Sequence, residues 1–226
     1  MQAAKLAVLG QLAAGITHEL AQPLGAMRTL SGNAIEFMKR GNLATVEQNL
    51  GIIARLADQM GRIITPLKTF ARKSPAIPAP TDLAHAVGAA LFLLDQRLTK
   101  ADITVTNRCE AGRDIAWCDQ NRLEQVLINL IRNAADAMAD SEHKTLTIDA
   151  TPGADGSLEL SIADTGCGLR DAGALFEPFF TTKPAGEGLG LGLAISRDIV
   201  REFGGDLRAE NRPEGGARFI LQLPAA

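Results

Sequence analysis

His18 and Glu19 are adjacent in the sequence and could act as a nucleophile and its base. An exposed imidazole is largely neutral at neutral pH, which leaves one ring nitrogen able to attack, and the carboxylate could accept the proton from the other nitrogen. Gln22 lies one helical turn further on the same face, and Pro23 cannot donate to the Glu19 carbonyl. Helical position alone favours an ordinary solvated histidine. The neighbouring carboxylate and proline, in a chain with only three histidines, favour the chemical role.

Two asparagines, Asn129 and Asn133, are one turn apart beside the apolar stripe of an expected helix over 119–139. Asparagine is a mediocre helix former, so a pair in register needs a reason. The ordinary explanation is that both amides are simply exposed to solvent. The alternative is a seat for Mg²⁺, which takes oxygen ligands and is often shared between a few protein groups and substrate phosphates.

Three later segments have compositions suited to a nucleotide. Asp164-Thr-Gly166-Cys-Gly168 follows an expected strand, so its glycines would let the backbone approach a flat ligand while the carboxylate accepts from an amine. Residues 176–183 (FEPFFTTK) are too apolar for a free loop, and a core anchor is the plain alternative. Residues 186–196 alternate glycine and leucine before a helix, which suits phosphate binding, although no G-K-[ST] follows.

The first 73 residues carry two apolar patterns with spacings of three and four, which predict two long helices. Gly41-Asn42 separates them, as is typical of a helix end, so we expect an antiparallel hairpin with His18 facing outward. Because further apolar residues widen the second pattern, the hairpin is expected to pair with a second copy in a four-helix bundle. The first pattern forms a seam of ten residues: Leu6, Leu9, Ala13, Ile16, Leu20, Pro23, Met27, Leu30, Ala34 and Phe37. The second forms a seam of eight: Val46, Leu50, Ile53, Ala57, Met60, Ile64, Leu67 and Ala71. The residues that widen the second seam are Leu56, Ile63 and Phe70.

A proline-rich stretch divides the chain, since residues 74–80 hold three prolines and cannot continue a helix. We expect a helical dimerisation domain over 1–73, a linker over 74–80 and a second domain over 81–226. Strands and helices mix in the second domain without a regular βαβ rhythm, which favours a two-layer α/β sandwich. The expected helices are 82–99, 119–139 and 190–204, and the expected strands are 102–107, 114–117, 144–151, 158–163, 206–211 and 217–223.

Composition excludes several classes of protein. The net charge of −3 argues against a general nucleic-acid binder, although residues 1–73 carry +5 and the remainder −8. No apolar run reaches the roughly 18–20 residues of a membrane span. The three cysteines, Cys109, Cys118 and Cys167, form no disulfide or zinc pattern and are expected to be buried thiols in a reducing compartment.

The segment Gly15–Leu24 (GITHELAQPL) resembles the phosphoacceptor box of the bacterial sensor histidine kinases. The flanking residues 5–15 and 70–73 look most like the dicarboxylate-transport and oxygen-sensing branch. Ala21 departs from that branch, which commonly has Asn there. Gln22 stands where other branches carry Thr or Asn, a position associated with dephosphorylation of the partner, so phosphatase activity is left open.

The asparagine pair and the three segments that follow it resemble, in this order, the N, G1, F and G2 boxes of the GHKL (Bergerat) ATP-binding domain. This domain is shared by histidine kinases, gyrases, Hsp90 chaperones and mismatch-repair ATPases. The resemblance implies that Asn133 coordinates Mg²⁺, that Asn129 helps hold the phosphates and that Asp164 bonds the adenine amine. It also implies a short mobile lid over 176–187. The other implied ATP-binding residues are Gly166, Gly168, Phe180, Lys183, Gly188, Gly190, Gly192 and Leu193.

The resemblance implies a protein-histidine kinase that uses ATP and Mg²⁺, autophosphorylates on His18 and passes the phosphoryl group to an Asp of a response regulator. It would act as a homodimer through residues 1–73, without nucleic acid or membrane contact, as the cytoplasmic core of a longer sensor. A conformational ATPase is one alternative, but hydrolases of this fold carry a Glu at the position of Asn129. A degenerate kinase that serves only as a scaffold is the other.

Overall fold

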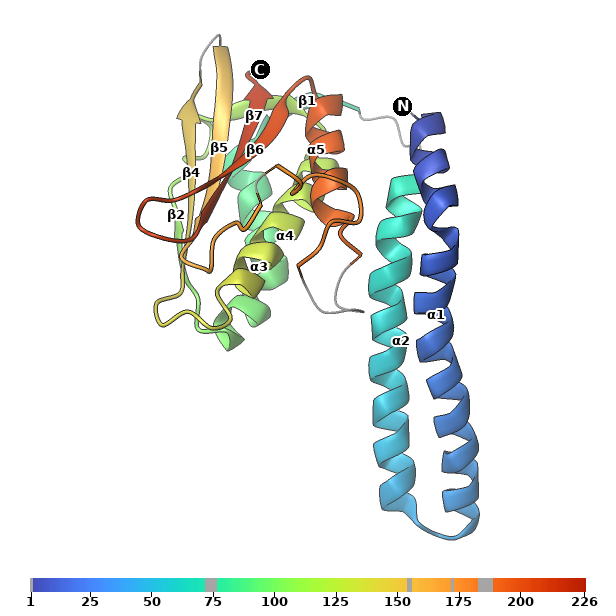
Figure 1. The fold of residues 1–226 in the computed structure, drawn as a ribbon. Helices are drawn as coiled ribbons and strands as arrows, with labels where there is room; N and C mark the ends of the chain where they lie inside the picture. Colours follow the sequence, from blue (N-terminus) through green and yellow to red (C-terminus); the bar gives the residue numbers. More distant parts are fainter. Residues whose placement is uncertain (1, 72–76, 154–155, 172, 183–188) are drawn as a thin grey trace. The chain divides into compact units, whose positions relative to one another are not determined.

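The computed structural model describes residues 2–71, 77–153, 156–171, 173–182 and 189–226 (Figure 1), without the side chains of 2–14, 62, 66 and 68–71. The chain divides into two compact units. One contains a helical hairpin and the described part of 179–191, and the other contains the described parts of 74–178 and 192–226.

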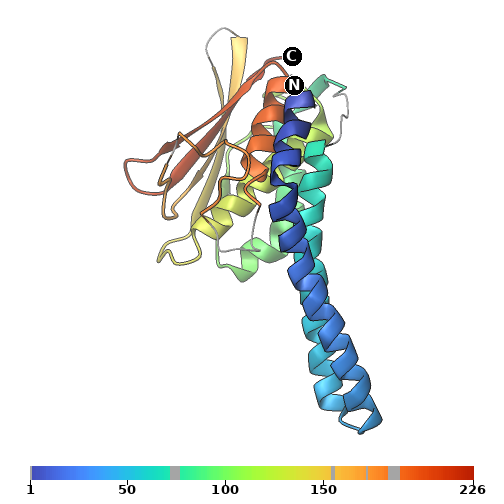
Figure 2. The same ribbon diagram turned by 45° about the vertical axis from the view of Figure 1, so that its right-hand side comes forward.

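The hairpin consists of α1 (Gln2–Lys39) and α2 (Leu43–Ala71), which run side by side in Figures 1 and 2. Helix α1 continues through Pro23. The turn follows from its residues: Gly41 takes a positive φ of 72°, and the Asn42 side chain accepts a hydrogen bond from the Thr45 amide at 3.2 Å. The predicted hairpin is therefore present.

The seam predicted for α1 is confirmed where its side chains are described, because Pro23 and Ala34 are buried and the other members are half-buried. Leu6, Leu9 and Ala13 lie outside the described side chains. The seam predicted for α2 is partly wrong: Leu50 and Ile64 are 55% and 46% exposed, whereas Ile63 is buried. The apolar stripe of α2 is wider than one seam, and the packing against α1 selects the flank that contains Asn49, Leu56 and Ile63.

The second unit is a two-layer α/β sandwich, as predicted. Its five-stranded sheet has the order β2-β4-β5-β7-β6, in which only β2 and β4 pair in parallel. Figure 1 shows helices against one face of this sheet, and the bounds of each predicted helix and strand of this unit lie within two residues of the prediction. The elements are α3 (Leu83–Lys100), β2 (Thr104–Asn107), β3 (Ile115–Cys118), α4 (Gln120–Ala137), β4 (Thr145–Pro152), β5 (Ser157–Asp164), α5 (Gly192–Glu202), β6 (Asp206–Asn211) and β7 (Ala217–Pro224).

Side-chain caps fix where the helices of this unit begin. Asp82 accepts from the Ala84 amide at 2.9 Å, and Asp119 accepts from the Arg122 amide at 3.2 Å, so these two aspartates cap α3 and α4. One strand escaped prediction: β1 (Ala79–Asp82) pairs with β3 and includes two residues expected in the linker. Proline is tolerated in such an edge strand, and Pro80 lies opposite Trp117.

The core lies between α4 and the sheet, where Leu127, Leu130, Leu160 and Ile162 are at most 1% exposed. Of the three cysteines only Cys118 is buried, whereas Cys109 is half-buried and Cys167 is exposed. The expectation of three buried thiols is thus wrong, because Cys167 lies in a surface loop after β5. Across the described residues, no helix has the length and apolarity needed to cross a membrane.

Candidate functional site

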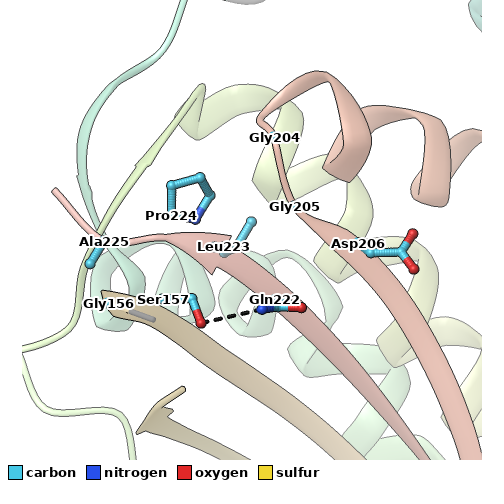
Figure 3. A pocket seen from close by; sticks show the side chains of 9 residues that line it. All are labelled: Gly156, Ser157, Gly204, Gly205, Asp206, Gln222, Leu223, Pro224 and Ala225. Carbon is cyan, nitrogen blue, oxygen red and sulfur yellow. Dashed lines mark hydrogen bonds between the residues drawn. The ribbon is translucent and has the colours of Figure 1, made fainter. Parts of the chain in front are cut away.

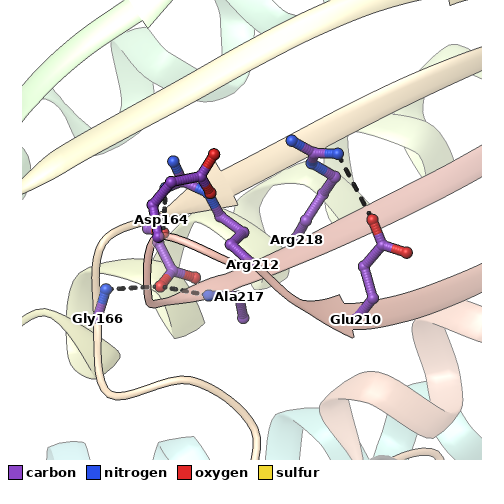
Figure 4. Close-up of polar contacts among 7 residues, drawn as sticks. Asp164, Gly166, Glu210, Arg212, Ala217 and Arg218 are labelled. Carbon is purple, nitrogen blue, oxygen red and sulfur yellow. Dashed lines mark hydrogen bonds and ion pairs between the residues drawn. The ribbon is translucent and has the colours of Figure 1, made fainter.

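Asp164 ends strand β5 and is the most buried acidic side chain of the site, with 1% exposure. Its Oδ1 accepts hydrogen bonds from the backbone amides of Gly166 (2.8 Å) and Ala217 (3.2 Å), as Figure 4 shows. Burial raises the pKa of the Asp164 carboxyl, while the two amides and the charge of Arg212 act in the opposite direction. Both bonds fall on Oδ1, so among the described residues Oδ2 is the oxygen left to meet a donor of a ligand.

The loop after Asp164 passes between the end of α4 and the turn that joins β6 to β7. A Cβ at Gly166 would lie 2.6 Å from the Ala137 carbonyl oxygen, so only glycine fits this approach. Gly168 has a φ of 74°, and a Cβ there would lie 2.8 Å from Asn211 Oδ1. Both glycines predicted to line the base pocket are therefore required by the backbone of this loop.

Asn129 and Asn133 both lie on α4 and are half-exposed. The amide nitrogen of Asn129 donates to Ser196 Oγ at 3.0 Å. Its oxygen faces Gly192 at the start of α5, where a Cβ would lie 2.5 Å from Oδ1. The fold thus brings Asn129 and the last glycine of the predicted phosphate loop together, at a helix N-terminus that can favour anions.

The aromatic segment is held partly by α5. The Arg197 guanidinium lies over the Phe176 ring, 4.8 Å from its centroid, and also donates to Asp206. Further on, the Phe179 amide donates to the Gly190 carbonyl at 2.9 Å, so the backbone before Phe180 lies against the glycine loop. Phe180, Gly190 and Leu193 are all half-exposed, whereas Lys183, Gly188 and the part of the expected lid over 183–187 lie outside the described residues.

In the hairpin, His18 is exposed on α1, as the heptad pattern predicts, and Glu19 is half-exposed. Gln22 Nε2 lies 3.0 Å from His18 Nε2. His18 and Gln22 therefore share the outward side of one helix, whereas Glu19 lies on the flank one turn before the buried Pro23.

A surface hollow lies elsewhere in the α/β unit, where the start of β5, the end of β7 and the connection from α5 to β6 meet (Figure 3). Gln222 donates to Ser157 across it at 3.4 Å. Its acidic member, Asp206, is already engaged by Arg197 and Arg201. The hollow contains none of the predicted site residues, so we do not place a nucleotide there.

Four residues that contact the site were missed from the sequence: Ser196, Arg197, Asn211 and Arg212. The serine and Arg197 follow the glycine loop on α5, and the other two belong to the β6–β7 turn, which looks like an ordinary polar turn in sequence. A polar residue at a strand end gives no signal of a partner 42 positions earlier in the chain.

Two family models match the chain. The model described as "His Kinase A (phospho-acceptor) domain" matches residues 8–75, and the one described as "Histidine kinase-, DNA gyrase B-, and HSP90-like ATPase" matches residues 118–226. The matches contain His18 and all the later segments singled out above.

Curated relatives include the C4-dicarboxylate transport sensor protein DctB of Rhizobium meliloti, which is 39% identical over all of this chain. The sensor protein FixL of Bradyrhizobium diazoefficiens is 34% identical over 98% of the chain. The chain spans only 36% and 45% of the length of these two relatives.

Among solved structures, the catalytic domain of histidine kinase ThkA is 30% identical, with a TM-score of 0.55 over 66% of this chain and 97% of that domain. The structure of ThkA in complex with the response regulator TrrA covers the whole chain, and 64% of the matched chain, with a TM-score of 0.72. At 23% identity, this second likeness concerns the fold alone.

Proposed function

Because the chain belongs to the sensor histidine kinase family, we propose that it is an ATP-dependent kinase core that phosphorylates itself on His18. The phosphoryl group would then pass to an aspartate of a response regulator. The observation that carries this proposal is the position of His18, which is exposed on α1 within the matched phosphoacceptor domain and has a carboxylate beside it.

Asp164 would recognise the base of ATP. Its Oδ2 can accept from the exocyclic amine of adenine, while Gly166 and Gly168 let the loop backbone approach the ring. The N-terminus of α5, beginning at Gly192, would favour the phosphates. Five further residues are assigned to the border of the phosphates from the sequence alone: Phe180, Lys183, Gly188, Gly190 and Leu193.

The asparagine pair suits Mg²⁺. Amide oxygens are ligands of the kind that this ion takes, and the contact with Ser196 turns Asn129 Oδ1 toward the glycine at the start of α5. Bound Mg²⁺ would neutralise charge on the phosphates. Asn133 would hold the ion, and Asn129 would present an acceptor rather than a base. A neutral amide cannot take a proton from water, which favours transfer to a side chain over hydrolysis.

In the transfer step, a nitrogen of His18 would attack the γ-phosphorus as the bond from phosphorus to the ADP oxygen breaks. Glu19 would accept the proton that leaves the other ring nitrogen. Catalysis would otherwise rest on positioning and charge stabilisation, as in phosphoryl transfer generally. Gln22 occupies the position that would influence dephosphorylation of the partner.

The proposal includes a homodimer formed by residues 1–73 and a receiver domain as the phosphoryl acceptor. Its setting would be the cytoplasm, with the signal supplied by other parts of a sensor, and neither nucleic acid nor membrane would be a direct partner. The solved complex of ThkA with its response regulator TrrA concerns that kinase, and it motivates the choice of a response regulator as the partner here.

Labelling with ATP that carries ³²P in the γ position tests the proposal. The unaltered chain should acquire label that is labile to acid and stable to base, and His18→Gln should bind ATP but acquire none. His85→Gln, a change at an exposed histidine on α3, is the matched control and should label normally. Release of phosphate without protein labelling would indicate the conformational ATPase instead. Absence of ATP binding would indicate the scaffold.

A further inference from the structure

We infer that Asn211 and Arg212, in the turn between β6 and β7, are positioning residues that hold the loop 164–169 in the conformation that reads adenine. The inference rests on the proposed role of Asp164 and deepens it. Neither residue belongs to the segments that suggested a nucleotide site, and neither is proposed to touch the nucleotide.

Asn211 holds the far end of the loop through both atoms of its amide. Its Oδ1 accepts from the Leu169 backbone amide at 2.6 Å, and its Nδ2 donates to the Leu169 carbonyl at 3.0 Å. A side-chain amide that pairs with both groups of one residue fixes the position and the orientation of that backbone. The absence of a side chain at Gly168 makes room for this contact.

Arg212 holds the near end. Its Nη1 donates to the Asp164 carbonyl at 2.7 Å, and its side chain is only 20% exposed (Figure 4). The turn itself is closed, because the Arg212 amide donates to Gly216 and the Gly215 amide donates to Arg212. Ala217, the first residue of β7, then donates to the Asp164 carboxylate. One turn therefore contacts the backbone and the side chain of Asp164.

The opposite side of the loop is fixed by α4, since the Cys167 amide donates to the Ala137 carbonyl at 3.1 Å. With one side fixed, the β6–β7 turn decides where the other side lies and how Asp164 Oδ2 is aimed. Loss of the contacts from Asn211 or Arg212 should therefore weaken the hydrogen bond from the adenine amine to Asp164, because that bond depends on the orientation of Oδ2. Contacts made by the phosphates should be affected less.

The test uses the full chain with Asn211→Ala, Asn211→Asp, Arg212→Ala and Arg212→Lys. Asn211→Asp keeps the acceptor and removes the donor, whereas Arg212→Lys keeps one charged donor. Glu210→Ala is the matched control, because Glu210 lies on the same strand and pairs with Arg218 rather than with the loop (Figure 4). Two quantities are measured: hydrogen exchange of the amides of 166–169 without nucleotide, and dissociation constants for ATP and GTP.

We expect faster exchange at Leu169 in Asn211→Ala but not in Asn211→Asp, because Asp keeps the acceptor of the Leu169 amide. ATP binding should be roughly tenfold weaker in Asn211→Ala and Arg212→Ala. GTP has a carbonyl oxygen where adenine has its 6-amine, so the dissociation constant for GTP should hardly change in these variants. The ratio of the GTP and ATP dissociation constants should therefore fall. Arg212→Lys should recover most of the ATP affinity, and Glu210→Ala should match the unaltered chain. A global loss of stability would not narrow the ratio of the two nucleotides.

Unchanged ATP affinity and nucleotide preference in the Ala variants would overturn the inference, whether or not exchange at Leu169 rises. In that case, the proposed function would still stand if the unaltered chain bound ATP and preferred it to GTP. If the unaltered chain bound no ATP, the proposed function would fail and this inference would fail with it.

Discussion

The amide nitrogen of Gln22 lies 3.0 Å from Nε2 of His18, one helical turn earlier on the exposed side of α1. An amide NH₂ group can only donate, so the tautomer compatible with this contact is the one that accepts at Nε2 and carries its proton on Nδ1. The lone pair at Nε2 is then engaged by Gln22, and this contact has to open before that nitrogen can attack phosphorus.

Gln22→Ala should therefore label faster than the unaltered chain. Breaking one exposed hydrogen bond costs about 0.5–1.5 kcal/mol, so we expect an increase of about two- to tenfold in the initial rate of labelling at saturating ATP. Gln48→Ala, a change at an exposed glutamine on α2, is the control. A slower rate in Gln22→Ala would mean that the amide assists the reaction.

Glu19→Gln tests the proposed base. The side chain is half-exposed on α1, so the exchange should leave the fold and the ATP affinity unchanged. Labelling should slow by roughly 10²–10⁴-fold, the usual effect of losing a general base. Glu47→Gln on α2 serves for comparison. An unchanged rate would remove Glu19 from the mechanism.

Asp164→Asn should separate binding from stability. One acceptor facing the adenine amine becomes partly a donor, so ATP binding should weaken by about ten- to a hundredfold. The amide oxygen can still accept from Gly166 and Ala217, so the free energy of unfolding without nucleotide should not fall at neutral pH. Calorimetric titration with ATP and denaturant unfolding measure the two effects.

The difference in unfolding free energy between the unaltered chain and Asp164→Asn should depend on pH. Burial raises the pKa of the Asp164 carboxyl above 3.8, so the folded state binds this proton more readily than the unfolded state. The stability that the protonated group contributes is complete below 3.8 and is lost as pH rises through the folded pKa. Relative to the unaltered chain, Asp164→Asn should therefore gain in unfolding free energy as pH rises from about 4 through the folded pKa. A shift in the opposite direction would contradict the raised pKa.

Apolar side chains left exposed on the single hairpin predict its self-association. Six of them are between 46% and 68% exposed, and such a set marks an interface. Leu50→Glu should weaken the dimer by about a hundredfold or more, because each copy would place a charge in the interface. Sedimentation measures this, and Phe92→Glu on α3 is the exposed apolar control. The six residues are Leu24, Ile35, Met38, Leu43, Leu50 and Ile64.

Arg28 should guide the proposed receiver domain, whose phosphoryl acceptor would be an aspartate. It is exposed on α1, ten residues or about 15 Å along the axis from His18, in a domain that carries +5. Charges at the rim of an interface act mainly on the association rate. When transfer starts from the phosphorylated kinase, Arg28→Glu should slow phosphoryl transfer to the receiver domain about tenfold at low salt. The difference in rate should shrink as salt rises, and autophosphorylation should be unchanged. Arg108→Glu is the charge-matched control, and equal transfer rates at every ionic strength would refute the idea.

Much of this protein can be predicted from local sequence. Helix and strand bounds follow from apolar periodicity and from caps such as Asp82 and Asp119, which depend on residues within one turn. The candidate nucleotide residues were found in the same way, because each lies in a short segment whose composition suits its chemistry. These features need no knowledge of what packs against them.

Only the tertiary structure decided which flank of α2 faces α1, because its apolar stripe is wide enough for Ile63 or Ile64 to be the buried residue. It also decided that Asn211 meets Leu169. That contact depends on the pairing of β5 with β7 and of β7 with β6, which brings the β6–β7 turn beside the end of β5. Strand order is fixed by packing across the whole sheet, so no pattern within either segment encodes a contact between residues 42 positions apart.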